Sequence, residues 1–390
     1  MRQNKVSAYG IVLLYACVYM ADAVYSTFIP VYLDNVGFDE AMIGILLSIG
    51  PLIAIMFQPL WGIASDRAKA KNYIIQILLI ISAFIILAYR ISSNFWYMLF
   101  VITAFSVFYI PIKSLTDAIA IELSESTQTQ FGRIRLGGSL GYAVMSVIGG
   151  ILAEKYLNSI FLLYFGISMG ALIILRKLPE VKGYQHDGSK ASPLEIIQGN
   201  KLALFIIFNF ILSMTFGFNA TFFPIYFQRM GASRALLGWA MFIATLGEIP
   251  FLLFADKIAE KFGIYTIFML SGIAFSIRWL LMGLATDIYM ILLVQLLSGL
   301  NLIVLSFSTI TYINSNVKKE LKATAQVIAV TFGISIPIML GSVAGGFLIE
   351  LIGMKQVYIC NALLAFIAVV VFAPIFMRSH KLENTGGADA

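Results

Sequence analysis

Apolar residues fall along this chain in long stretches that short polar segments separate. A membrane-spanning helix needs about 20 consecutive apolar residues, and most of these stretches reach or approach that length. The pattern predicts an all-α membrane protein with twelve transmembrane helices, at roughly 9–33, 41–62, 73–89, 95–121, 136–156, 159–176, 202–228, 236–254, 264–286, 288–312, 324–349 and 356–377.

One stretch of sequence occurs twice. Residues 27–44 read TFIPVYLDNVGFDEAMIG and residues 221–238 read TFFPIYFQRMGASRALLG, with seven identities at an offset of 194. A second echo, SVIGGILAE at 146–154 and SVAGGFLIE at 342–350, has an offset of 196. Two echoes at nearly one offset indicate a duplicated half. Parallel membrane repeats with a site between them are typical of transporters.

The longest polar stretch, 177–201, divides the twelve apolar runs into six and six. Its Gly, Ser and Lys content is typical of a linker. The sequence therefore predicts two six-helix pseudo-repeats. They are an N-terminal six-helix bundle at 1–176 and a C-terminal six-helix bundle at 202–382, with a cytoplasmic central linker at 177–201 and a disordered tail at 383–390.

Charge is scarce and unevenly distributed. Only 12% of the residues are charged, whereas soluble proteins carry about 25%. Of the 26 Lys and Arg, 19 fall at the termini and in the loops after even-numbered spans. The positive-inside rule therefore predicts a multi-pass protein of the cell membrane with both termini in the cytoplasm. This topology explains the net charge of +6, so we expect a lipid bilayer around the protein and no nucleic-acid partner.

Motifs of enzymes and metal sites are missing from the sequence. It contains no GxxxxGK[ST] nucleotide loop, no HExxH and no Cys/His cluster. We therefore expect no enzyme activity, no cofactor and no metal. The two histidines, His186 and His380, fall in predicted cytoplasmic segments, so no imidazole can carry protons inside the membrane.

Few ionisable residues fall inside the predicted spans, and such residues are functional candidates because their insertion into lipid is costly. Lys113 and Asp117 are four residues apart on one helix face, so they can pair. The alternative for any such pair is a structural salt bridge that holds helices together. The candidates are Asp22, Lys113, Asp117, Glu248 and Arg278, with Arg135 at a span entrance.

Several motifs resemble the major facilitator superfamily. Residues 57–71, FQPLWGIASDRAKAK, resemble its signature loop, except that Lys69 stands where the family usually has glycine. Residues 130–142, QFGRIRLGGSLGY, resemble the oligosaccharide–proton symporters and the phenylpropionate permeases. Three shorter motifs resemble the phenylpropionate branch more closely: GEIPF at 247–251, IRWLLMG at 277–283 and QLLSG at 295–299. The resemblance covers nearly the whole chain and implies a twelve-helix transporter that works by alternating access.

The signature-like loop supplies candidate gating residues. Asp66 can neutralise a helix terminus, and Arg67 and Lys71 can pair across a cytoplasmic gate. Gly62 would permit tight packing at the helix end. We expect these four residues to control opening of the cytoplasmic side; the alternative is a basic loop that only sets topology.

The resemblance also implies substrate-binding residues. Asp117 and Arg135 match the acid and arginine that bind substrate in the sugar symporters, and Tyr142 falls where those proteins stack an aromatic ring on the sugar. Glu248 and Arg278 match the family's acid in the eighth span and arginine in the ninth. The chain departs from the family in the tenth span, because the positions of its lysine, histidine and glutamate relay are here Gln295, Ser298 and Asn301.

We therefore expect a secondary active transporter that imports a small organic solute by proton-coupled symport, and that acts as a monomer. If transport is proton-coupled without this relay, a carboxylate must carry the proton. Glu248 and Asp117 are favoured because each has a possible arginine competitor, whereas Asp22 has none and could serve only as a hydrogen-bonding group in a water-filled cavity. Arg135 and Arg278 could hold a carboxylate, or be neutralised and leave a sugar or nucleoside as substrate. A passive facilitator and a drug or metabolite efflux antiporter are the alternatives, although the fifth span lacks the proline of the efflux glycine motif.

Overall fold

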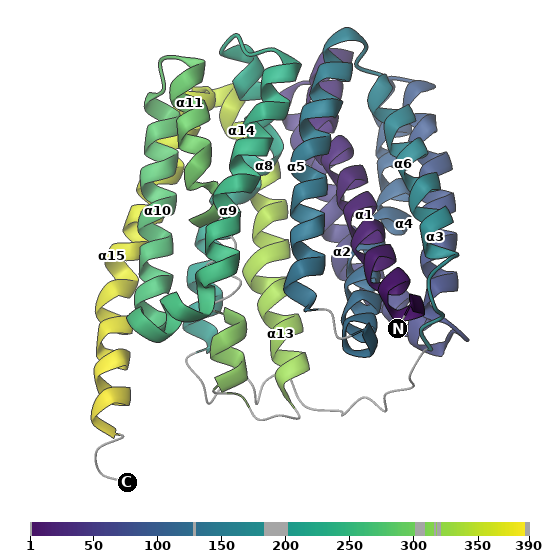
Figure 1. Ribbon diagram of the computed structural model, residues 1–390. Helices are drawn as coiled ribbons and strands as arrows, with labels where there is room; N and C mark the ends of the chain where they lie inside the picture. The colour runs from purple at the N-terminus through teal and green to yellow at the C-terminus, as the bar shows by residue number, and fades with distance from the viewer. Residues whose placement is uncertain are drawn as a thin grey trace. The chain divides into compact units, whose positions relative to one another are not determined.

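The computed structural model describes residues 2–127, 130–182, 202–300, 309–315, 317 and 321–386. These residues are mainly helical, and no β-strand occurs among them (Figure 1). The α-helices are α1 (Arg2–Val36), α2 (Glu40–Arg67), α3 (Lys71–Ile85), α4 (Phe95–Thr127), α5 (Phe131–Lys155), α6 (Ser159–Leu175), α8 (Leu202–Arg229), α9 (Arg234–Phe262), α10 (Ile264–Leu284), α11 (Ile288–Gln295), α13 (Lys322–Val330), α14 (Ile336–Ile352) and α15 (Met354–Gly386).

Shorter helical turns extend three of these helices. A 3-10 turn, η1 (Ile86–Arg90), continues α3, and a second, η2 (Leu296–Leu300), continues α11. A π-helical turn, η4 (Thr331–Ser335), joins α13 to α14. Prolines lie inside several spans, including Pro30 in α1 and Pro111 in α4, as membrane helices tolerate.

Nine helices in the described part of the chain are long and apolar enough to cross a membrane, and two shorter apolar helices, Ser159–Leu175 and Ile288–Gly299, accompany them. Large apolar side chains such as Trp96 and Leu351 are exposed, as expected of surfaces that face lipid. The predicted class of all-α membrane protein is therefore confirmed.

The predicted linker and tail fall largely outside the described residues. Of the linker, only residues up to 182 are described. Helix α15 extends to Gly386, into the segment predicted as a tail, and residues 387–390 lie outside the described part.

The repeated segments fold alike where α1 and α8 end. Gly37 and Gly231, equivalent at the offset of 194, have φ of 101° and 97°, a backbone conformation that glycine adopts without strain. Gly37 donates its N–H to the carbonyl of Asp34 at 3.1 Å, and Gly231 donates to that of Gln228 at 2.9 Å. These are glycine C-caps, so the sequence repeat reflects a repeated turn.

The next helices begin with equivalent N-caps. Asp39 accepts the N–H of Met42 through Oδ1 at 2.7 Å, and Ser233 accepts that of Leu236 through Oγ at 3.1 Å. Aspartate and serine are preferred at this position because their side chains satisfy a free N–H of the first turn.

The chain divides into two compact units. Unit 1 comprises Met1–Gly188 with Thr221–Thr245, and unit 2 comprises Ser189–Ala220 with Leu246–Ala390. In unit 1, α1 packs against α5 and α6, α2 against α4, and α3 against α4 and α6; in unit 2, α10 packs against α15 (Figure 1). Residues 221–245, which follow the midpoint of the sequence, therefore belong to the same unit as the first six helices.

Glycines of the predicted fifth and eleventh spans lie at close helix contacts. A Cβ added to Gly138 would lie 2.6 Å from the ring of Tyr15, and one added to Gly141 would lie 2.8 Å from the carbonyl oxygen of Ala16. In unit 2, a Cβ on Gly341 would collide with the backbone of Met214. Small residues let membrane helices approach this closely.

Candidate functional site

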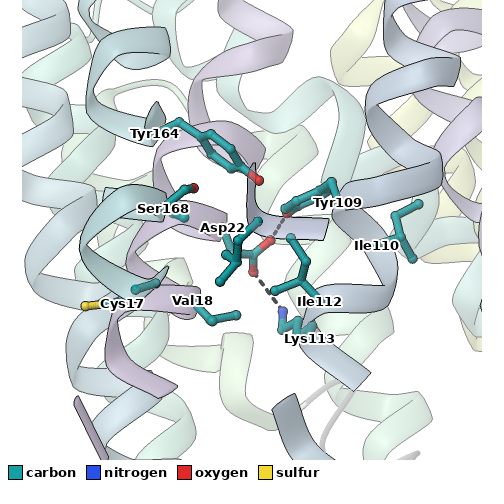
Figure 2. Close-up of a pocket in the computed structure, with 12 residues that line it drawn as sticks. Cys17, Val18, Asp22, Tyr109, Ile110, Ile112, Lys113, Tyr164 and Ser168 are labelled. Carbon is teal, nitrogen blue, oxygen red and sulfur yellow. Dashed lines mark hydrogen bonds and ion pairs between the residues drawn. The ribbon is translucent and has the colours of Figure 1, made fainter. Parts of the chain in front are cut away.

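A cavity of about 200 Å³ lies inside unit 1, between α1, α3, α4 and α6. Its wall is mostly apolar but includes one carboxylate and one ammonium group (Figure 2). The lining residues are Cys17, Val18, Ala21, Asp22, Leu79, Tyr109, Ile110, Ile112, Lys113, Tyr164, Ser168 and Ala171.

The carboxylate of Asp22 on α1 is held by two side chains of α4. Lys113 Nζ lies 2.7 Å from Asp22 Oδ2, and the Tyr109 hydroxyl donates to Asp22 Oδ1 (Figure 2). Lys113 and Tyr109 are four residues apart, which places them on one face of α4. A charge within a membrane span is costly unless it is paired, and here each charge neutralises the other.

This geometry corrects the partner expected for Lys113. The sequence offers Asp117, one turn further along α4, and leaves Asp22 without a partner. In the structure Lys113 reaches across to Asp22 on α1 instead. The long lysine side chain spans the gap between two packed helices, and sequence spacing carries no information about such a contact.

The two members of the pair differ in accessibility. The Lys113 side chain retains 43% of its exposure, whereas that of Asp22 retains 14%. Lys113 Nζ also lies 4.5 Å from the centre of the Tyr19 ring, a distance at which the ring attracts a cation. The Lys113 side chain is therefore the more exposed member of the pair, although its ammonium contacts both Asp22 and the Tyr19 ring.

Hydroxyl groups surround the Asp22 segment. Ser26 Oγ donates to the backbone carbonyl of Asp22 at 2.7 Å, and the Tyr142 hydroxyl lies 3.3 Å from Ser26 Oγ and 3.4 Å from Thr27 Oγ1. The structure thus brings Tyr142, a predicted substrate-binding residue, close to Asp22. Ser26 was not recognised from the sequence, because serine occurs widely in membrane helices as a packing residue.

Asp117, the predicted acid, lies one turn beyond Lys113 on α4, within electrostatic reach of both Lys113 and Arg135, the predicted arginine. Oδ1 of Asp117 is buried and has no hydrogen-bond partner in the described part of the chain, and Arg135 is exposed on α5. None of the ion pairs found among the described residues joins them. Their joint role in binding substrate stays a prediction.

The other predicted pair lies in unit 2. Arg278 on α10 is 2% exposed and donates from Nη2 to Gln295 Oε1 at 3.0 Å. Its Nε and Nη1 have no hydrogen-bond partner among the described residues. Glu248 lies half-buried on α9, and its pairing with Arg278 stays a prediction. Gln295 was noted in the sequence only as a departure from the family relay; Asn301 lies outside the described residues.

Of the predicted gating residues, Asp66 and Lys71 come together. Lys71 Nζ lies 3.8 Å from Asp66 Oδ1 and makes a closer ion pair with Glu122 on α4. Arg67 ends α2. The tight packing expected at Gly62 is not met in this conformation, since a Cβ added there would meet no described atom within 4 Å. Gating by these residues stays a prediction.

The turn after α1 contacts the turn after α8. Arg229 Nη2 lies 2.8 Å from Asp34 Oδ1, and Arg229 Nη1 donates to Glu40 Oε1. Arg234 Nη2 donates to Asn35 Oδ1 at 3.2 Å. We call these five residues the turn clasp; all of them belong to unit 1.

The turn clasp follows the sequence repeat. At the offset of 194, Asn35 is equivalent to Arg229 and Glu40 is equivalent to Arg234. Because Asn35 contacts Arg234 and Glu40 contacts Arg229, each turn presents the same two positions to the other, as in a two-fold symmetric interface. The repeat reveals which positions are equivalent but not that the two copies touch.

Helices α5 and α9 meet beside the turn clasp. Glu154 Oε2 near the end of α5 accepts the backbone N–H groups of Arg234 and Ala235, at 2.6 and 3.3 Å. A carboxylate here satisfies free donors of the first turn of α9 and is favoured by its dipole. A Cβ added to Gly150 on α5 would lie 2.7 Å from the carbonyl oxygen of Arg234, so the two backbones are in contact.

Apolar helices that enclose a charged pair beside a cavity are typical of multi-pass membrane transporters. Within the described ranges, His, Cys, Asp and Glu form no group of three or more that could hold a metal ion. A model of the MFS_1 like family matches residues 11–360. The chain therefore belongs to that family, within the major facilitator superfamily, and is a transporter rather than an enzyme.

Known proteins agree with this assignment. The chain is 26% identical to the "Uncharacterized transporter YwbF" of Bacillus subtilis (strain 168), over 88% of this chain and 87% of the relative. It is 24% identical to the "Probable 3-phenylpropionic acid transporter" of Escherichia coli (strain K12), over 92% and 95%. The crystal structure of the nucleoside transporter NupG has the same fold, with a TM-score of 0.84 and 17% identity over 96% of this chain and 99% of that one.

Proposed function

We propose that this transporter is a twelve-helix secondary active importer that carries a small organic solute together with protons by alternating access. It acts as a monomer in the cell membrane, with two six-helix halves and both termini in the cytoplasm. The family assignment supports the transport class. Relatives named for 3-phenylpropionic acid and maltose suggest carboxylates and sugars as candidate substrates, and the nucleoside transporter of similar fold adds nucleosides.

The observation that carries proton coupling is the Asp22–Lys113 ion pair. A carboxylate enclosed among membrane helices can hold a proton when its cation is taken away and can release it when the cation returns. Substrate that competes for Lys113 would therefore change the proton affinity of Asp22, and coupling of this kind is reciprocal. Asp117 and Glu248 remain the other candidate proton carriers.

Alternating access needs a closure at each end of the pathway. The cluster of Asp66, Lys71 and Glu122 supports a cytoplasmic closure, with Arg67 and Gly62 beside it. Loops predicted to face the other side of the membrane carry the turn clasp and the contact between α5 and α9. We assign these contacts to the closed form of the outer gate, whose opening requires the two turns to separate.

Uptake into proteoliposomes tests this function. Radiolabelled 3-phenylpropionate, maltose and uridine are offered with an inward proton gradient, and accumulation of one of them should collapse on addition of a protonophore. Asp22→Asn should abolish accumulation, as should Arg135→Gln and Arg278→Gln if the arginines bind substrate. Glu180→Gln is the matched control, because its exposed carboxylate also accepts a tyrosine hydroxyl, that of Tyr73, at 2.6 Å. Equilibration without accumulation in the wild type would identify a passive facilitator.

A further inference from the structure

We propose, on the basis of this function, that Lys113 binds the anionic group of a monoanionic substrate, and that Asp22 takes up one proton for each anion. Transport by this exchange moves no net charge. The inference goes beyond proton coupling itself, because a proton-coupled transporter of a neutral solute would carry net charge in every cycle.

The accessibility of the ion pair determines which charge a solute meets. Lys113 keeps 43% of its side-chain exposure, against 14% for Asp22. Asp22 is also enclosed by the Tyr109 hydroxyl on its other oxygen. A solute therefore approaches the pair more easily along the Lys113 side chain than along Asp22, and the group that can replace Asp22 beside Lys113 is an anion rather than a hydroxyl group or a cation.

The walls beside Lys113 suit an apolar body attached to the anion. The ring of Tyr19 lies against the ammonium, and Leu79, Ile112 and Val18 line the cavity. The cavity volume is about 200 Å³, and a cavity of roughly 150 Å³ holds a benzene molecule. A small carboxylate with an aromatic or branched aliphatic body fits these dimensions and this polarity.

Charge balance gives the stoichiometry. Without substrate, Asp22 and Lys113 sum to zero. When a carboxylate binds Lys113, the ion pair to Asp22 breaks and the site carries one negative charge in surroundings where uncompensated charge is unfavourable. A proton that bonds to Asp22 restores neutrality, and no covalent bond of the substrate changes. Release of the anion lets Lys113 return to Asp22, which then loses its proton.

Other titratable or charged groups surround the pair, and they bear on its pH dependence. They are Cys17, Tyr19 and Tyr25 on α1, Tyr109 and Asp117 on α4, Arg135 and Tyr142 on α5, and Tyr164 on α6. Tyrosines and cysteine are ordinarily neutral near pH 7, so Asp117 is the competing proton acceptor, and Asp117→Asn separates its contribution from that of Asp22.

Binding is measured first, by calorimetry with purified protein between pH 6 and 8. Affinity for 3-phenylpropionate should rise by up to about tenfold for each unit that the pH falls, because one proton enters with each anion. Asp22→Asn should bind with little pH dependence and Asp117→Asn should keep the wild-type slope. Lys113→Gln should lose binding, Lys113→Arg should retain it, and Lys177→Gln on the surface is the control.

Charge movement in the wild type gives a second test that needs no variant. On a solid-supported membrane, a monoanion from a panel of 3-phenylpropionate, benzoate and isovalerate should be taken up with the proton gradient and give no current. Three results would overturn the inference. They are a steady inward current with the transported monoanion, binding that does not depend on pH, and failure of every monoanion to bind. Proton-coupled current with maltose or uridine would overturn it while leaving the proposed function intact, and absence of gradient-driven uptake would remove the proposed function itself.

Discussion

Replacement of Gly150 by alanine should shift the protein away from the conformation described here. Its added Cβ would lie 2.7 Å from the carbonyl oxygen of Arg234 and 3.2 Å from the Cα of Gly238. Ordinary contacts need about 3.5 Å, so α5 and α9 must separate by roughly 0.8 Å. Both obstacles are backbone atoms, so a side-chain rotation cannot relieve the collision.

The energetic effect follows from the size of this overlap. Overpacking of a close contact costs about 1–3 kcal/mol, and the cost falls only on the form in which α5 and α9 touch. A difference of that size changes the ratio of closed to open forms by about 5- to 150-fold. The ion pairs of Arg229 in the closed form contribute only about 0–1 kcal/mol each. They are therefore too weak to offset the cost of the added methyl group.

Spin labels at Tyr156 and Trp239, both exposed, report the separation of α5 from α9 in detergent or nanodiscs. In Gly150→Ala the distance distribution should move to longer values. Gly166→Ala on α6 is the control, because its Cβ would meet no described atom within 4 Å, and it should leave the distribution unchanged. An unchanged distribution in Gly150→Ala, in a protein that folds, would refute the assignment of this contact to a gate.

Two further predictions concern the signature-like loop and the start of α3, which follows it. Asp66→Asn should lower the initial rate of uptake without changing substrate affinity. Glu122→Gln should lower it more, because Glu122 is the nearer partner of buried Lys71. Equal uptake rates in the wild type and both variants would remove the gating role. Asn72→Ala should lower the free energy of unfolding by about 1–3 kcal/mol, because the Asn72 side chain hydrogen-bonds to the backbone of Pro179 and Val181. Tyr73→Phe, at the exposed neighbouring position, should lower the apparent melting temperature far less. An equal fall in melting temperature in both variants would contradict this reasoning.

Local features of the fold follow from the sequence. The apolar runs predict the membrane helices, and the repeated Gly37 and Gly231 predict two equivalent turns, because each feature depends on residues that are neighbours in the chain. The pairing of Asp66 with Lys71 is also local, since one tight turn separates them, but the motif suggests a pair across the gate for Lys71 and does not predict this contact. Glycines in the fifth and eleventh spans indicate close helix contacts without identifying the helices they touch.

The central ion pair depends on contacts that the sequence does not encode locally. Helical spacing favours Asp117 as the partner of Lys113, but Asp22 lies 91 residues away and approaches only after α1 packs against α4. Glu122 was missed as a partner of Lys71 for the same reason. The turn clasp could not be predicted from the repeat, because a repeat shows that two turns are equivalent but not that they contact each other.

The most direct test of coupling at the Asp22–Lys113 pair compares exchange with accumulation in Asp22→Asn proteoliposomes. The solute among 3-phenylpropionate, maltose and uridine that stabilises the purified wild type against thermal unfolding serves as substrate. The variant should still exchange labelled for unlabelled solute without a gradient, yet fail to accumulate it when a proton gradient is imposed. Accumulation at the wild-type level in Asp22→Asn would show that the proton is carried elsewhere and would contradict the proposed mechanism.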